Sequence, residues 1–329
     1  MRVPWKLVLR STVSVVLLAL LVQRVHLSSL LPTWDLRTAL WLGAALVLTL
    51  VGIVLSTIRW RQVLEALGLH ERIRTLFSHY LAGLFVGNFL PSTIGGDVLR
   101  VTRLSADNGD RPDTFASVVL ERLTGWLILP VLTLVAMVVN PGLRELGAAS
   151  AVACTIAAAT LALLAGTLFA AANPRIGGRL AGTTGWQRFA GAVHLGLDRL
   201  RHHPGAACSV LAAGFAYQLV VVLTGLLAAR ALGLDVSLTA ALAFMPAVAI
   251  AQVLPISLGG LGVREGAFVL FLGPLGVPAA QAVALGLLVY GLNLAVSLLG
   301  APAFAVGGRT PPPSTGTAVL PPSGGPALT

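Results

Sequence analysis

Six long apolar runs limit what this sequence can fold into. They lie at 7–25, 39–58, 114–139, 146–172, 206–233 and 278–306. A helix needs about 20 apolar residues to cross the hydrocarbon core of a bilayer. Only 10% of the 329 residues are charged, whereas about 25% are charged in a typical soluble domain. The sequence therefore predicts an all-α, polytopic membrane bundle and excludes a soluble enzyme.

Three further apolar runs are shorter than a typical span. They lie at 76–90, 238–254 and 267–275, and the first two each end in Leu-Pro. With the long runs they predict about seven to eight spans plus short or re-entrant helices. The run at 7–25 is preceded by basic residues but followed by no small-residue cleavage site, so we interpret it as an uncleaved first span.

The sequence divides into a membrane domain at 1–306 and a tail at 307–329. The tail is rich in Pro, Gly, Ser and Thr and is expected to be disordered. Within the membrane domain we expect two half-repeats, approximately 39–172 and 206–306, joined by an amphipathic linker at 173–205. Two interpretations of the linker stay open, a helix lying on an anionic leaflet or a solvated connector. The linker has a helical pattern, because its apolar positions recur every three to four residues, at Phe189, Val193, Leu197 and Leu200.

The net charge of +10 comes from arginines that fall between the apolar runs. Residues 59–75 contain four Arg and residues 173–205 contain five, whereas 140–145 contain one and 234–237 none. Positively charged loops stay in the cytoplasm, so we expect a cytoplasmic N-terminus. Both Arg-rich loops can lie inside only if 76–90 enters the membrane and returns. The basic residues thus indicate topology, and nucleic acid is not an expected partner.

An eleven-residue motif occurs twice, 164 residues apart. Its shared frame is L-P-x-x-x-G-G-x-x-x-R, which begins at Leu90 and again at Leu254. Pro ends the preceding helix, and the Gly pair permits unusual backbone angles and close approach. Such backbone survives at membrane depth only when it is buried in protein or lines a polar cavity. Two interrupted helices in corresponding halves point to a transporter binding site, and they would form an inverted pair if they enter from opposite sides.

Two charged residues, Glu121 and Arg122, lie inside the long run at 114–139. Ionisable groups inside a membrane are costly and are functional candidates by default. For Glu121 we expect Arg264 as the partner, and for Arg122 either Asp97 or Glu265. A purely structural ion pair remains the alternative.

A basic cluster near the two motifs is suited to a phosphate. If a helix follows Gly96, Asp97 and Arg100 share one of its faces. Arg100, Arg103 and Arg264, beside glycine-rich backbone amides, would make an anion site for a lipid phosphate. The His and Cys residues show no metal-ligand spacing, so no metal and no cofactor are expected.

Three motif blocks together resemble a known family. They are Asn88-Phe-Leu-Pro91-x3-Gly95-Gly96-Asp97-x2-Arg100, Glu121-Arg122-x2-Gly125 and Pro255-x3-Gly259-Gly260-x-Gly262-x-Arg264-Glu265. The pattern is similar to the lysylphosphatidylglycerol synthase transmembrane, or flippase-like, family of bacterial and archaeal membrane proteins. The likeness covers roughly residues 10–306.

The resemblance implies the lipid-translocating part of that family, because the tail after residue 306 leaves no room for its aminoacyl-transferase domain. We therefore expect a flippase of a polar-headed phospholipid or glycolipid in a bacterial inner membrane. A membrane-embedded enzyme that modifies lipid head groups, or a non-catalytic scaffold of an envelope lipid pathway, are the alternatives. Expected partners are lipids with anionic or sugar-linked head groups, with a second copy or a separate lipid-modifying enzyme as further candidates. The substrate-binding candidates are Asn88, Pro91, Gly95, Gly96, Asp97, Arg100, Glu121, Arg122, Pro255, Gly259, Gly260, Gly262, Arg264 and Glu265.

Overall fold

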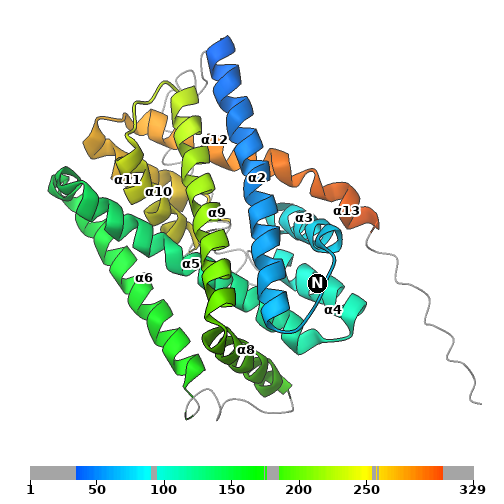
Figure 1. Cartoon of the computed structure of the whole chain (residues 1–329). Coiled ribbons are helices and arrows are strands. Elements are labelled where there is room, and N and C mark those ends of the chain that lie inside the picture. The colour runs from blue at the N-terminus through cyan, green and yellow to red at the C-terminus, as the bar shows by residue number, and fades with distance from the viewer. Residues whose placement is uncertain are drawn as a thin grey trace, which may run out of the picture.

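The computed structural model describes residues 35–89, 95–173, 175, 185–253, 257 and 259–306. Within these ranges every regular element is a helix, as the sequence predicts (Figure 1). The predicted span at 7–25, the tail at 307–329, and Pro91 and Pro255 of the two motifs lie outside the described residues. The helices are α2 (Leu36–Ala66), α3 (Ile73–Phe89), α4 (Gly95–Asn108), α5 (Arg111–Val139), α6 (Ala148–Ala172), α8 (Gly185–His202), α9 (Pro204–Ala231), α10 (Leu238–Val253), α11 (Val263–Leu272), α12 (Ala279–Ser297) and α13 (Gly300–Val306).

Five stretches of the described chain are long and apolar enough to cross a membrane. They are Leu36–Ala66, Arg111–Val139, Ala148–Ala172, Pro204–Ala231 and Ala279–Val306. Each coincides with one of the predicted long runs, which confirms a polytopic helical bundle. The last stretch is interrupted, because α12 ends at Ser297 and α13 begins at Gly300.

Helices α2 and α9 form an antiparallel pair in the middle of the molecule (Figure 1). Gly52, near the middle of α2, lies against Tyr217 and Val220 of α9. Further along α2, Arg59 lies against Gly214, which comes earlier in α9. The order of these contacts reverses along the chain, so the two helices run in opposite directions.

Helices α3 and α4 form a short hairpin that returns to the end where it began. The hairpin is tight because glycines meet across it. A Cβ atom on Gly83 would lie 2.8 Å from the Gly96 carbonyl oxygen. Arg199 of α8 donates a hydrogen bond to the carbonyl of Leu67, which directly follows α2. The Arg-rich connection before α3 and the Arg-rich region of α8 therefore lie at the same end, as the charge distribution predicts.

The opposite end holds the connections that are poor in arginine. Asn140, which follows α5, donates a hydrogen bond of 3.0 Å to the Thr239 hydroxyl at the start of α10. Helix α10 therefore begins at this end, whereas α3 begins at the other. Helices α10 and α11 pack on each other and form a second hairpin, and its glycines Gly259, Gly260 and Gly262 have φ angles of 58°, 77° and 83°. These positive φ angles match the expectation for the second motif. Gly95 and Gly96 of the first motif instead lie in α4 and do not have positive φ, so there glycine serves close approach alone.

Helix α8 confirms the helical pattern of the linker. Its buried Ala192 and Leu200 pack in one apolar cluster with residues of α2, α5 and α9. Val193 and Leu197 pack against the same cluster, so this part of the apolar face is covered by protein. The side chain of Phe189 lies outside the described set.

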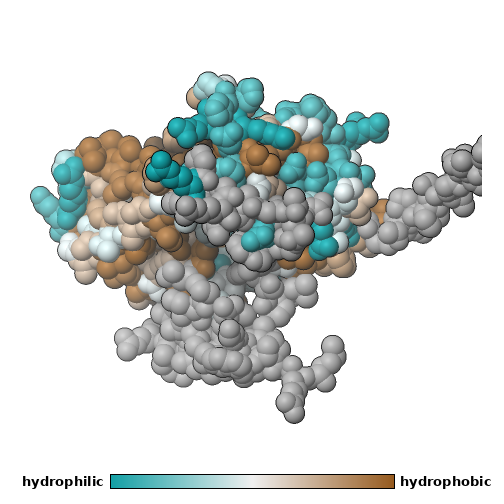
Figure 2. All heavy atoms as spheres, turned by 90° about the horizontal axis from the view of Figure 1, so that it is seen from below, coloured by the Kyte–Doolittle hydropathy of each residue, from teal (hydrophilic) through white to brown (hydrophobic). Residues whose placement is uncertain are grey.

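The outer surface separates polar and apolar regions. Figure 2, which looks from below at the end that carries α8, shows hydrophilic residues in teal over part of that face. Exposed residues at this end include Arg61, Glu65 and Arg201. The left side of the same view is largely brown, and Leu163 and Phe169 of α6 are 68% and 69% exposed. A large exposed apolar surface is expected where helices face lipid.

Candidate functional site

The first motif places charged side chains of α4 against those of α2 and α5. Glu121 of α5 is buried and accepts two hydrogen bonds from Arg59 of α2, with an Arg59 Nε to Glu121 Oε1 distance of 3.1 Å. Arg100 of α4 contacts the other carboxylate oxygen of Glu121 at 3.3 Å. A buried carboxylate survives at this depth because two guanidinium groups hold it.

Asp97 at the start of α4 joins the same network. Arg122 lies 2.9 Å from Asp97 Oδ2 and donates a 3.0 Å hydrogen bond to Oδ1. Arg100 Nη1 also lies 3.2 Å from Asp97 Oδ1. Asp97 and Arg100 therefore share a face of α4, as predicted. The Asp97–Arg122 pair is one of the two partner assignments expected from the sequence.

Within this network Arg100 is the cation that neither carboxylate holds closely. Three arginines, Arg59, Arg100 and Arg122, face two carboxylates, so the group carries a net charge of +1 when all are ionised. Glu121 is held through two nitrogens of Arg59, and Asp97 is held by Arg122 at 2.9 Å. Arg100 contacts both carboxylates at the longer distances of 3.2 and 3.3 Å. The surplus positive charge is thus assigned most directly to Arg100.

Aromatic rings stabilise the buried cations. The Arg100 guanidinium lies 4.1 Å from the Trp60 ring centroid and 4.5 Å from that of Tyr80. Arg59 lies 5.2 Å from the Tyr217 centroid. The negative face of an aromatic ring attracts a cation most strongly when water is excluded. The rings therefore hold Arg100 in place without using its hydrogen-bond donors.

Four buried side-chain donors in and around this network have no hydrogen-bond partner within the described structure. They are Nε and Nη2 of Arg100, Nη1 of Arg59 and Nδ2 of Asn88. Arg100, Asn88, Asp97 and Arg122 line a cavity of about 180 Å³ together with Tyr80 and the α3–α4 glycines. Unpaired buried donors are costly. A cavity lined by Arg100 and Asn88, beside surplus positive charge, is suited to an anionic or strongly hydrogen-bonding ligand.

The second motif builds a neutral pair instead. Arg264 donates to its neighbour Glu265 with an Nε to Oε1 distance of 3.0 Å. The Gly262 amide donates to Glu265 Oε2 at 2.6 Å, and Arg264 lies 4.8 Å from the Tyr290 ring centroid. Glu265 therefore holds the turn at Gly262 and neutralises Arg264 at the same time. In the described residues this pair shares no hydrogen bond or ion pair with the Arg100 network.

Two expectations about charge partners are wrong. Glu121 pairs with Arg59 and Arg100 rather than with Arg264, because the charge of Arg264 is satisfied locally by Glu265. Arg103 does not join the anion site. It donates instead to the carbonyls of Ala303 and Phe304 in α13, at 2.8 and 2.7 Å.

Arg59 is the functional candidate that sequence reasoning missed. In the sequence it directly follows the apolar run at 39–58, a position that indicates only topology. Its place beside Trp60, one residue past that run, was the signal that it could turn inward. A Cβ atom on Gly125 would lie 2.6 Å from Arg59 Nη1. Gly125 of the second motif block therefore makes room for the Arg59 side chain.

A comparison with protein families bears on these motifs. The family described as the lysylphosphatidylglycerol synthase TM region matches residues 7–300. The chain belongs to this family. No curated protein matches the chain at a significant level.

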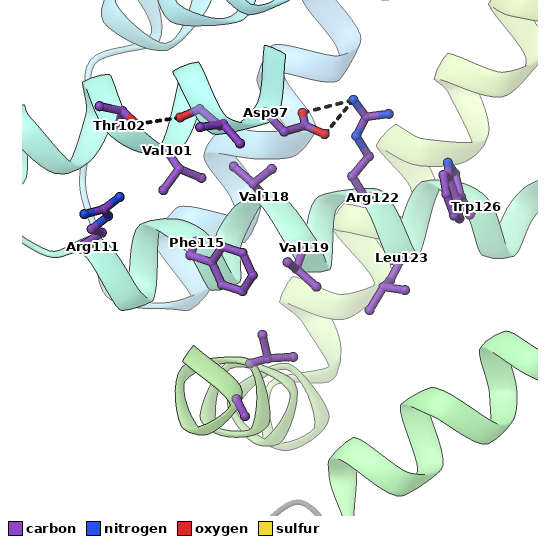
Figure 3. Close-up of a pocket in the computed structure, with 13 residues that line it drawn as sticks. Asp97, Val101, Thr102, Arg111, Phe115, Val118, Val119, Arg122, Leu123 and Trp126 are labelled. Atoms are coloured by element: carbon purple, nitrogen blue, oxygen red, sulfur yellow. Dashed lines mark hydrogen bonds and ion pairs between the residues drawn. The ribbon is translucent and has the colours of Figure 1, made fainter. Parts of the chain in front are cut away.

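The TM region has a second, apolar cavity beside the charged network. It has a volume of about 680 Å³ and lies between α4, α5 and α8 (Figure 3). Its walls are mostly apolar, with Arg111 toward one end and the Asp97–Arg122 pair toward the other. Asp97 and Arg122 also line the polar cavity. The two cavities therefore meet at one ion pair.

Proposed function

We propose that this protein binds the phosphate of a polar-headed lipid in the Arg100 cavity and moves the lipid between leaflets. One observation carries the proposal: Arg100 and Asn88, which have buried donors without a partner, are among the residues that line a polar cavity within a network of net charge +1. A phosphate oxygen would accept from these donors and balance the surplus charge. A phospholipid or a phosphate-linked glycolipid supplies that group.

The arrangement of the helices supports transport. In each half a long helix, α2 or α9, precedes a short hairpin, and a further long segment follows it. The two leading helices are antiparallel and the two hairpins begin at opposite ends of the molecule. We infer an inverted repeat, in which each glycine-rich turn serves one side. Inverted repeats with interrupted helices are a recurring design of alternating-access transporters.

The carboxylates favour transport over head-group chemistry. An enzyme would need a free base, but Asp97 and Glu121 are each held by arginines and Glu265 by Arg264 and the Gly262 amide. The oxygens of these carboxylates are thus already occupied by hydrogen-bond donors of the protein. Asp97, which is half-buried at the cavity wall, is placed to balance Arg122 or to contact a cationic head group.

The test is a head-group exposure assay. Phosphatidylglycerol with a fluorophore on its head group is reconstituted with the protein in vesicles, and a membrane-impermeant quencher reports movement from the inner leaflet. Arg100→Gln removes the guanidinium group that is proposed to bind the phosphate. Losing charge-assisted hydrogen bonds worth about 1.5–3 kcal/mol should slow movement at least about tenfold.

The matched control is Arg61→Gln, which removes an arginine of α2 in an exposed pair with Glu65. It should leave the rate within about twofold, because exposed pairs contribute little. Equal rates in wild type and Arg100→Gln would disprove the site assignment. No movement by wild type with phosphatidylglycerol or with a panel of glycolipids would count against transport itself.

A further inference from the structure

The apolar cavity between α4, α5 and α8 has an assignable occupant. Val98 and Val101 come from α4, Phe115, Val119 and Leu123 from α5, and Val193 from α8 (Figure 3). The hydroxyl of Thr102, a polar group in the wall, already donates to the Val98 carbonyl at 2.8 Å. Between its charged ends the cavity therefore offers a ligand little except apolar contact.

We propose that this cavity binds an alkyl chain of the ligand whose phosphate lies in the Arg100 cavity. The inference rests on the proposed function and adds where the lipid tail lies. Its basis is adjacency, because Asp97 and Arg122 line both cavities. A ligand that fills both must be anionic at one end and apolar at the other, which is the chemistry of a phospholipid.

The length and lining of the cavity suit an extended alkyl chain. Arg111 and Arg122 are eleven residues apart on α5, so the cavity extends for about 16 Å. An extended peptide would leave its backbone groups without partners along these walls, at a high cost in free energy.

Helix α8 forms one wall of the apolar cavity. Ala190 and Val193 form the wall that faces α5. Gly196, one turn later, lies so close to α5 that a Cβ atom would be 2.8 Å from a methyl carbon of Leu120. The linker helix α8 therefore closes one side of the proposed tail site.

Photolabelling tests the proposal directly. Phosphatidylglycerol that carries a diazirine in the middle of one acyl chain is bound to the detergent-solubilised protein and irradiated. The labelled residues are identified by mass spectrometry. We expect adducts on 98–102, 115–126 and 190–193, the walls of the cavity. Labelling confined to lipid-facing residues such as Val135 and Leu163 would overturn the proposal.

Two variants fill the cavity from facing walls, Val119→Trp and Ala190→Trp. Each should reduce labelling of the cavity at least fivefold. The control Val135→Trp places the same side chain on the exposed face of α5, where Val135 is 51% exposed, and should leave labelling within twofold. Unchanged labelling in both cavity variants would contradict the proposal. If one variant fails to fold, the variant on the other wall and the wild-type adduct map still test whether the cavity binds an alkyl chain.

The readouts separate this inference from the proposed function. Binding of glycerol 3-phosphate, which has no alkyl chain, reports only on the Arg100 cavity and should be lost in Arg100→Gln but kept in Val119→Trp. Cavity adducts without lipid movement would support the tail site and contradict transport. Lipid movement with adducts only on the outer surface would support transport and contradict the tail site.

Discussion

Arg59, Glu121 and Arg100 show how a charge survives inside this bundle. Each carboxylate of the network has one close cation, Arg59 for Glu121 and Arg122 for Asp97. Arg100 is shared between the two and is held mainly by Trp60 and Tyr80. At the scale of single residues, this division separates arginines that stabilise the fold from the one that we propose binds a ligand.

Glu121→Gln should destabilise the protein strongly. The substitution removes the negative charge between Arg59 and Arg100 and leaves two buried cations facing each other. Breaking a buried pair by removing one partner costs about 3–5 kcal/mol. The measurement is thermal unfolding of the detergent-solubilised protein. Glu65→Gln, in an exposed pair with Arg61, is the control and should shift the free energy of unfolding by less than about 1 kcal/mol.

Arg100→Lys should separate stability from binding. Lysine keeps the positive charge, so the network should unfold near the wild-type temperature. It lacks the planar fork that stacks on Trp60 and presents several donors to one anion. Calorimetric titration with glycerol 3-phosphate should therefore show binding at least about tenfold weaker, for a loss near 1.4 kcal/mol. Wild-type affinity in this variant would show that charge alone holds the ligand.

At the scale of elements, the α3–α4 hairpin depends on glycines that the sequence motif only partly identifies. Gly96 belongs to the repeated frame and was predicted to allow close approach. Its contact, Gly83, lies outside that frame, seven residues before Leu90. A sequence pattern can mark one side of a tight contact, but the partner is set by how the helices rotate on each other.

Gly83→Ala should destabilise the hairpin. The new Cβ atom would lie 2.8 Å from the Gly96 carbonyl oxygen and 2.9 Å from Arg100 Cγ. Backbone cannot yield easily, so we expect a loss of about 1–3 kcal/mol. Gly87→Ala is the control on the same helix, because its Cβ would meet Gly96 at an ordinary 3.8 Å. Thermal unfolding should show a loss for the first variant and none for the second. Equal effects would contradict the packing.

At the scale of the whole molecule, the two Arg-rich regions share one end and the Arg-poor connections share the other. The contacts that establish this are Arg199 with Leu67, and Asn140 with Thr239. The positive-inside rule then predicts that the first end is cytoplasmic. The membrane location follows from the family and the apolar helices, whereas the orientation is a prediction.

Cysteine accessibility tests that orientation. In a background in which Cys154 and Cys208 are replaced by alanine, His70→Cys and His203→Cys should react with an impermeant maleimide only in inverted vesicles. Ser237→Cys should react in intact cells, because it lies at the opposite end. All three native residues are exposed. Reaction of His70→Cys and Ser237→Cys from the same side would contradict the topology.

The sequence by itself determined that the outer surface faces lipid rather than water, where the helices lie, and where the turns between them fall. Apolar length decides whether a segment can span a bilayer, and Pro and Gly act on the backbone locally, so both are readable along the chain. Only the tertiary structure decided the charge partners, because Arg59 and Glu121 are 62 residues apart and meet through the packing of α2 on α5. The two motifs share one residue frame, but their arginines are partnered differently in the structure. Arg264 is neutralised by its own neighbour, whereas Arg100 lines a cavity and keeps two donors without a partner. That difference depends on side-chain geometry which no residue pattern specifies.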